Sequence, residues 1–205
     1  MSELSRGDIL AGRYELIKKC GRGGMGQVWR AVDRHLEETI ALKLLRPDID
    51  VGEDRVALVT HEARVAHRLK HPHVVPVRDV IQDGELQFVT MDFIDGPSLK
   101  DALARRSPLP LGEVVALAAG MCSDVDYIHA RGIIHRDIKP GNFLVDEDGR
   151  AKLSDFDLAL PVSGPREKLK VDERAGTLPY MSPEQLTKPE IDWRSDIYCL
   201  GATLY

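Results

Sequence analysis

Apolar and polar residues alternate along the first part of the chain, from Tyr14 to about residue 49. A period of two is typical of strands with one buried face, so this stretch predicts strands joined by tight turns. Between residues 53 and 69 apolar residues recur at steps of three and four, which predicts one helix. Two further strands are expected at residues 74–81 and 86–94, separated by the turn Gln82-Asp83-Gly84. This part of the chain should therefore form a small sheet interrupted by a helix.

The pattern changes after Gly96. Residues 111–129 carry apolar side chains at helical spacing, and we expect no strand between Gly96 and a short one at residues 143–145. The second half is therefore predicted to be mainly helical, with a boundary near residues 92–96. Together the two halves indicate the α+β class.

Composition narrows the range of functions. The chain has 205 residues, 43% of them apolar, and a net charge of −5 with both signs spread along the sequence. It can bury a sizeable core, and it has neither the basic patch of a nucleic-acid-binding protein nor that of a membrane-binding one. The first ten residues include three charged side chains, and no later run approaches about 18 uncharged apolar residues, so we expect no signal peptide, no membrane segment and a cytoplasmic location. Reduced thiols are expected for the three widely spaced cysteines, Cys20, Cys122 and Cys199.

A glycine-rich segment follows the first predicted strand. Glycines let backbone amides approach phosphate oxygens that a Cβ would keep away. A plain turn would also explain glycines at this spacing, and so would a dinucleotide-binding loop. The residues after the glycines alternate like a strand and do not start a helix, which argues against the dinucleotide-binding loop. The remaining reading is a β-hairpin over phosphates, built from Gly21, Gly23, Gly24, Gly26 and Val28.

The richest chemistry lies at residues 135–142, which read His-Arg-Asp-Ile-Lys-Pro-Gly-Asn, and at Asp155-Phe156 thirteen residues after the asparagine. This span places a proton acceptor, Asp137, close to a cation, Lys139, and to two oxygen ligands, Asn142 and Asp155. Transfer of a phosphoryl group from Mg·ATP to a hydroxyl requires this set of groups.

Together with Ile40-Ala41-Leu42-Lys43, these motifs resemble the catalytic core of protein kinases over residues 12–205, and they look most like bacterial Ser/Thr kinases of the eukaryotic type. The resemblance implies a two-lobed fold, with a small antiparallel sheet lobe that carries one helix and a mainly helical lobe. Residues 1–12 would be a tail, residues 13–92 the ATP-binding lobe, and residues 93–205 the catalytic lobe. Kinase domains continue for several more helices, so this lobe is expected to be incomplete.

The resemblance also implies roles for individual residues. Asp137 would accept the proton of the attacking hydroxyl, and Lys139 would neutralise charge on the γ-phosphate. Asn142 and Asp155 would hold Mg²⁺, with Mn²⁺ as a substitute. The substrates would be Ser/Thr residues of proteins, including the kinase itself, and no nucleic acid would take part.

The remaining residues would bind ATP. Lys43 would reach the α- and β-phosphates and pair with Glu62 of the predicted helix, or with Glu53 as a fallback. In isolation Lys43 would be read as a solvated strand edge, and only the neighbouring motifs reverse this interpretation. The other nucleotide contacts would come from Gly21, Gly23, Gly24, Gly26, Val28, Ala41, Met91, Asp92, Phe93, Ile94 and Leu144.

One departure keeps an alternative open. Asp157 stands where the family has the glycine of Asp-Phe-Gly, and a side chain there restricts the backbone. A pseudokinase, which would bind nucleotide or act as a scaffold, is the alternative that Asp157 and the missing helices favour. The intact set of Lys43, Asp137, Asn142 and Asp155 opposes it. A small-molecule kinase is disfavoured because the Gly176-Thr177 segment is typical of enzymes with protein substrates.

The local histidines raise a different question. His61, His67, His71 and His73 could suggest a zinc site, but no cysteine accompanies them and His61 and His67 fall on different faces of the predicted helix. We expect them to be surface and loop residues.

Overall fold

The computed structural model describes residues 4–23, 26–45, 69, 71–156, 160–161, 178–187 and 191–205. The chain divides into two compact units. The first comprises Met1–Leu69 and Pro76–Phe93, and the second comprises Lys70–Val75 and Ile94–Tyr205. The lobe ranges expected from the sequence, 13–92 and 93–205, remain predictions, and the structure assigns residues 70–75 to the second unit. The predicted helix at residues 53–69 lies outside the described residues, apart from Leu69.

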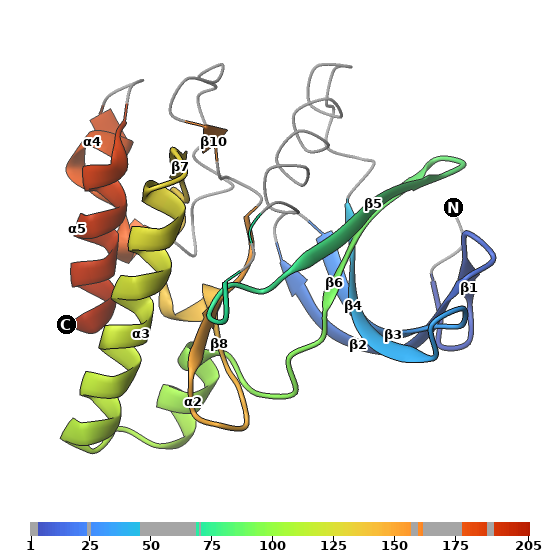
Figure 1. Cartoon of the computed structure of the whole chain (residues 1–205), viewed down its shortest axis with the longest axis horizontal. Helices are drawn as coiled ribbons and strands as arrows, with labels where there is room; N and C mark the ends of the chain where they lie inside the picture. Colours follow the sequence, from blue (N-terminus) through green and yellow to red (C-terminus); the bar gives the residue numbers. More distant parts are fainter. Residues whose placement is uncertain are drawn as a thin grey trace. The chain divides into compact units, whose positions relative to one another are not determined.

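The first unit contains a six-stranded antiparallel sheet in the order β1-β2-β3-β4-β6-β5 (Figure 1). Its strands are β1 (Ile9–Leu10), β2 (Tyr14–Gly23), β3 (Gly26–Asp33), β4 (Glu38–Leu45), β5 (Val77–Asp83) and β6 (Leu86–Asp92). The sheet predicted from the alternating pattern is therefore confirmed. β2 and β3 form a hairpin in which Gly23 is paired with Gly26, so the hairpin predicted at the glycine segment is confirmed as well.

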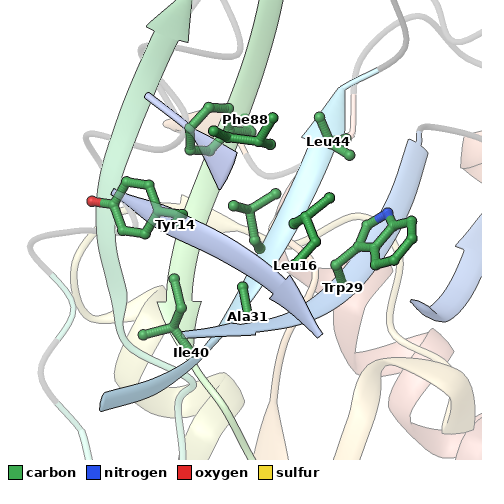
Figure 2. Close-up of a cluster of buried hydrophobic side chains, with 9 residues drawn as sticks. Tyr14, Leu16, Trp29, Ala31, Ile40, Leu44 and Phe88 are labelled. Atoms are coloured by element: carbon green, nitrogen blue, oxygen red, sulfur yellow. The ribbon is translucent and has the colours of Figure 1, made fainter. Parts of the chain in front are cut away.

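The two faces of this sheet carry different residues, because directly paired residues of antiparallel strands share a face. On one face, Trp29 is paired with Leu42 and Leu44 with Phe88. Figure 2 shows this face packed into a hydrophobic cluster of nine buried residues: Leu10, Tyr14, Leu16, Trp29, Ala31, Ile40, Leu42, Leu44 and Phe88. The opposite face of the sheet carries Lys43 together with residues outside this cluster.

Phe88 anchors this cluster. Its side chain is fully buried, and its ring meets the edge of Tyr14 at 5.8 Å between centroids. We expect Phe88→Leu to lower the free energy of unfolding of the protein by about 1 to 1.5 kcal/mol, because the aromatic contact is lost while most of the volume is kept. Urea denaturation measures the change. Leu36→Ala, at a position that is 56% exposed, should stay within about 0.5 kcal/mol of the wild type. A Phe88→Leu protein as stable as this control would contradict the assignment of the core.

The second unit is mainly helical, as the sequence predicted (Figure 1). Its helices are α2 (Leu99–Arg105), α3 (Leu111–His129), α4 (Pro183–Thr187) and α5 (Trp193–Leu204), with short 3₁₀ turns η1 (Pro140–Asn142) and η3 (Leu178–Tyr180). Two small antiparallel sheets complete it, one pairing β8 (Phe143–Val145) with β9 (Ala151–Leu153) and the other pairing β7 (Ile133–Ile134) with β10 (Leu160–Pro161). The expectation of no strand before residue 143 is wrong at β7, since a two-residue strand is too short to show a period.

α3 begins and ends where the spacing of apolar residues predicted. Met121, Val125 and Ile128 form its buried face, together with the polar Asp124. Val115 and Cys122, which belong to the same predicted pattern, are exposed. The helix therefore turns a carboxyl group toward the core and leaves Val115 and Cys122 on the surface.

Asp124 faces two of the histidines that raised the zinc question. Its Oδ1 lies 3.6 Å from His71 Nδ1 and 3.8 Å from His73 Nδ1, and Tyr127 stacks on the His71 ring. These two histidines lie in the loop before β5, as expected, but they are half-buried, so the expectation that they are surface residues is wrong. Within the described parts of the chain, no group of three or more His, Cys, Asp or Glu side chains could hold a metal ion. His61 and His67 lie outside those parts.

Candidate active site

The segment between β7 and β8 is positioned by a buried aspartate of α5. Asp196 is fully buried, and its Oδ2 and Oδ1 accept the backbone N–H groups of His135 and Arg136, each at 2.8 Å. Its Oδ2 also lies 2.9 Å from Nε2 of His129, the last residue of α3. One side chain thus ties two helices to the loop, and the loop can keep Arg136 at a positive φ of 69°, which a residue with a side chain rarely adopts.

His135 fixes the loop from inside. Its Nδ1 lies 3.3 Å from the backbone N of Asp137, and its Nε2 lies 3.1 Å from the carbonyl oxygen of Ser154. Because the first partner is a donor and the second an acceptor, these contacts fit the imidazole tautomer with its proton on Nε2. The ring also packs on Phe156 at 5.0 Å between centroids. His135 therefore links the Asp137 segment to the segment that carries Asp155.

Asp137 is 7% exposed, and its two carboxylate oxygens have different surroundings. Oδ2 accepts hydrogen bonds from Lys139 Nζ at 2.6 Å and from Asn142 Nδ2 at 2.9 Å. The same amide group of Asn142 donates to the backbone oxygen of Asp137 at 2.7 Å. Oδ1 is buried and has no hydrogen-bond partner among the described residues. The carboxylate is thus fixed through one oxygen, and the other oxygen keeps its capacity to accept a hydrogen bond.

Asn142 and the residue before Asp155 are bound to each other. The backbone N–H and the hydroxyl of Ser154 both donate to the carbonyl oxygen of Asn142 at 2.9 Å. Asp155 follows with a positive φ of 66°. Two side chains with oxygen donors suit a hard cation such as Mg²⁺, which takes few protein ligands and completes its shell with water and phosphate oxygens. The donor set therefore fits the metal that the sequence implied.

In the first unit, the register places several predicted nucleotide contacts on the sheet face opposite the hydrophobic cluster. Val28 is paired with Lys43, and Ala41 is paired with Met91. Lys43 is 7% exposed. These four residues therefore share one face of three adjacent strands.

The glycine hairpin includes one close approach of the backbone. A Cβ on Gly26 would come within 1.8 Å of the carbonyl oxygen of Leu44 in β4, whereas a Cβ on Gly21 would meet nothing within 4 Å. Gly26 is thus required by the pairing of β3 with β4, whatever it does for phosphate. Gly23 ends β2, and Gly24 lies outside the described residues.

The remaining candidates are three consecutive residues at the end of β6 and after it, and one residue of β8. Asp92 uses its side chain to accept from Arg78 Nε at 2.6 Å and donates its backbone N–H to Pro76. Phe93 stacks against the guanidinium of Arg30, with 4.9 Å from Cζ to the ring centroid. Ile94 begins the longer segment of the second unit, and Leu144 is half-buried in β8. Four residues discussed for the sequence fall outside the described residues: Glu53, Glu62, Asp157 and Thr177.

Comparison with known proteins shows to which family the chain belongs. The family model described as "protein kinase domain" matches residues 14–205. The chain belongs to the protein kinase family.

Several relatives of this kinase-family chain are bacterial proteins. It is 40% identical over 203 residues to the serine/threonine-protein kinase PknE of Mycobacterium bovis, and this match covers 98% of this chain and 35% of the relative. It is 35% identical over 200 residues to the probable serine/threonine-protein kinase PknB of Lactococcus lactis, covering 97% and 32% respectively. The chain thus spans about a third of the length of the curated relatives it matches. The resemblance seen in the motifs is confirmed.

A solved structure confirms the two-lobed kinase-like fold. The crystal structure of the Mycobacterium tuberculosis PknI kinase domain, C20A mutant, matches with a TM-score of 0.78 and 29% sequence identity. The match covers 99% of this chain and 76% of that one. None of the helices among the described residues is long and apolar enough to span a membrane.

Three residues that support the site were missed in the sequence: His135, Ser154 and Gln185. Each acts through a bond to a backbone group, and such bonds leave no mark on hydrophobic spacing. Their position inside or beside the kinase motifs was the only signal that could have found them.

Proposed function

We propose that this protein transfers the γ-phosphate of ATP to serine and threonine hydroxyls of protein substrates. The observation that carries the proposal is the arrangement of Asp137, which is fixed at Oδ2 by Lys139 and Asn142 and offers a buried Oδ1 with no partner among the described residues. An oxygen in this situation is suited to accept the proton of an attacking hydroxyl. The names of the bacterial relatives support the same reaction.

Each group would have a defined task. Asp137 orients the substrate hydroxyl through Oδ1 and takes up its proton late in the transfer. Lys139, whose ammonium lies beside Asp137, offsets negative charge on the γ-phosphate. Asn142 and Asp155 would hold Mg²⁺, which when bound neutralises charge on the phosphates. In the first unit, Lys43 would bind the α- and β-phosphates.

The finer assignments belong to the same proposal. The backbone of the hairpin glycines Gly21, Gly23, Gly24 and Gly26 would contact the phosphates, with Glu62 as the partner of Lys43. The nucleotide base would contact Val28, Ala41, Leu144 and the segment Met91, Asp92, Phe93 and Ile94. The reaction would take place in the cytoplasm, in signal transduction, and would include autophosphorylation.

Incubation with radiolabelled ATP, Mg²⁺ and a generic basic protein tests the proposal. We expect label on phosphoserine and phosphothreonine after acid hydrolysis, and at least about a tenfold loss of label when the metal is chelated, because the phosphate charges are then not neutralised. Nucleotide binding without transfer would contradict the proposal in favour of a pseudokinase. Label found mainly on phosphotyrosine would contradict the Ser/Thr assignment.

A further inference from the structure

Gln185 is a buried amide in the short helix α4, 7% exposed, and it joins three separate segments of the second unit. Its Nε2 donates to the carbonyl oxygen of Arg136 at 2.7 Å. Its Oε1 accepts the backbone N–H of Ser182 at 3.0 Å and faces the thiol of Cys199 in α5 at 3.2 Å. Burial raises the pKa of the Cys199 thiol to about 12, so this group stays protonated and donates. Because donors face Oε1 and an acceptor faces Nε2, the orientation of the amide is determined.

The bond to Arg136 ends on the peptide unit that precedes Asp137. The oxygen of this peptide unit accepts from Gln185, and its N–H, which belongs to Asp137, points to His135 Nδ1 at 3.3 Å. The peptide plane is therefore held at both ends. Rotation of this plane would change the backbone angles of Asp137 directly, and with them the direction of its carboxylate.

The backbone on the other side of Arg136 needs such support. Arg136 has a φ of 69°, a left-handed conformation that an arginine does not favour, and Asp196 binds only its N–H. Without Gln185, the peptide after Arg136 would lose the bond to its carbonyl oxygen, while the contact of its N–H with His135 would remain. The bond to Asp196 would not prevent it from turning.

We propose that Gln185 is a positioning residue for Asp137, which fixes the peptide unit between Arg136 and Asp137 and so aims the carboxylate at the substrate hydroxyl. The proposal rests on the phosphotransfer function proposed above. Through this one side chain, the backbone at Ser182 is linked to the loop between β7 and β8 that carries Asp137. Gln185 itself does not touch the reacting atoms.

Two variants test it. Gln185→Met keeps the length of the side chain and removes all of its hydrogen bonds, whereas Gln185→Glu keeps the shape and replaces the amide donor by an oxygen. We expect both to lower kcat by about tenfold and to leave the KM for ATP within about twofold, because orientation is lost while nucleotide contacts remain. Hydrogen exchange of residues 135–142 should become faster in both.

Thr187→Val is the matched control, because Thr187 lies in the same helix, is exposed, and donates its hydroxyl only within α4, to the Pro183 carbonyl. It should keep the kcat and the exchange rates of the wild type. All proteins are compared well below their melting temperatures. If Gln185→Met fails to fold, the kcat and exchange rates of Gln185→Glu test the proposal.

The possible failures are distinguishable. An active wild type together with Gln185 variants that keep both kcat and slow exchange in residues 135–142 would overturn the positioning role. A wild type that transfers no phosphate would contradict the proposed function instead. In that case faster exchange in the Gln185 variants, but not in Thr187→Val, would still support the positioning of the loop, and unchanged exchange would overturn it.

Discussion

Asp137→Asn is expected to lower kcat for Ser/Thr phosphorylation by about 10²- to 10⁴-fold, the range that removal of a general base produces. An amide has the same shape, so Lys139 and Asn142 still find an oxygen at the position of Oδ2. The group at Oδ1 can no longer take up a proton. Steady-state kinetics with a peptide substrate measures the loss.

Affinity for Mg·ATP should change by no more than about threefold in Asp137→Asn, because the assigned task of this side chain concerns the hydroxyl and not the nucleotide. Equilibrium binding of a fluorescent ATP analogue measures it. The control is Asp148→Asn, an exposed aspartate in the turn between β8 and β9, which should leave kcat unchanged. An Asp137→Asn enzyme with more than a tenth of wild-type kcat would be incompatible with the proton-accepting role.

The second large effect concerns stability and pH. Asp124 is fully buried, and neither of its oxygens has a hydrogen-bond partner among the described residues. Burial raises its pKa from the ordinary 3.8 to about 9, against the smaller opposing effect of Lys152. The folded protein therefore keeps a proton on Asp124 at neutral pH, while the unfolded chain releases it.

The sign follows from proton linkage. Since the folded state binds the extra proton, the contribution of Asp124 to stability is fully present below pH 3.8 and is lost as the pH rises toward about 9. His71 acts in the opposite direction, because burial in the first place, and then His73 and Arg131, lower its pKa below 6.5. The contribution of His71 to stability is complete above pH 6.5. Between about pH 7 and 9, therefore, the change of the free energy of unfolding with pH comes from Asp124 and not from His71.

Wild-type protein should thus lose about 2 kcal/mol of unfolding free energy between pH 7 and 9 relative to Asp124→Asn, at a limiting slope of about 1.4 kcal/mol per pH unit. Urea titrations at several pH values measure the slopes. Asp126→Asn, at an exposed position of the same helix, should follow the wild-type curve. Parallel curves for the wild type and Asp124→Asn would contradict the buried, protonated state.

Elements with a clear period could be predicted from the sequence, and single polar contacts could not. The run of apolar residues gave the bounds of α3, because a helix of 19 residues shows its spacing repeatedly. The same run did not predict that Asp124 is buried, although this residue stands on the buried face, three positions after Met121 and four before Ile128. A polar residue at such a position was the available signal.

The candidate site shows the same division. Asp137, Lys139, Asn142 and Asp155 could be predicted as site residues because family motifs keep them close in sequence. Gln185 reaches a backbone oxygen 49 residues away, and only the folded chain brings the two together. Sequence spacing reports which face of an element is apolar, and it carries no information about which backbone group a distant side chain meets.

The alternation along β4 has a consequence for how the chain can evolve. Ile40, Leu42 and Leu44 fill the hydrophobic cluster, while Ala41 and Lys43 occupy the other face of the same strand. A slip of one residue would place the lysine among the hydrophobic cluster and move the isoleucine and leucines to the opposite face, so the protein would lose its core. Selection for a stable fold alone therefore keeps position 43 on the face opposite the cluster, and it acts against insertions or deletions within this strand.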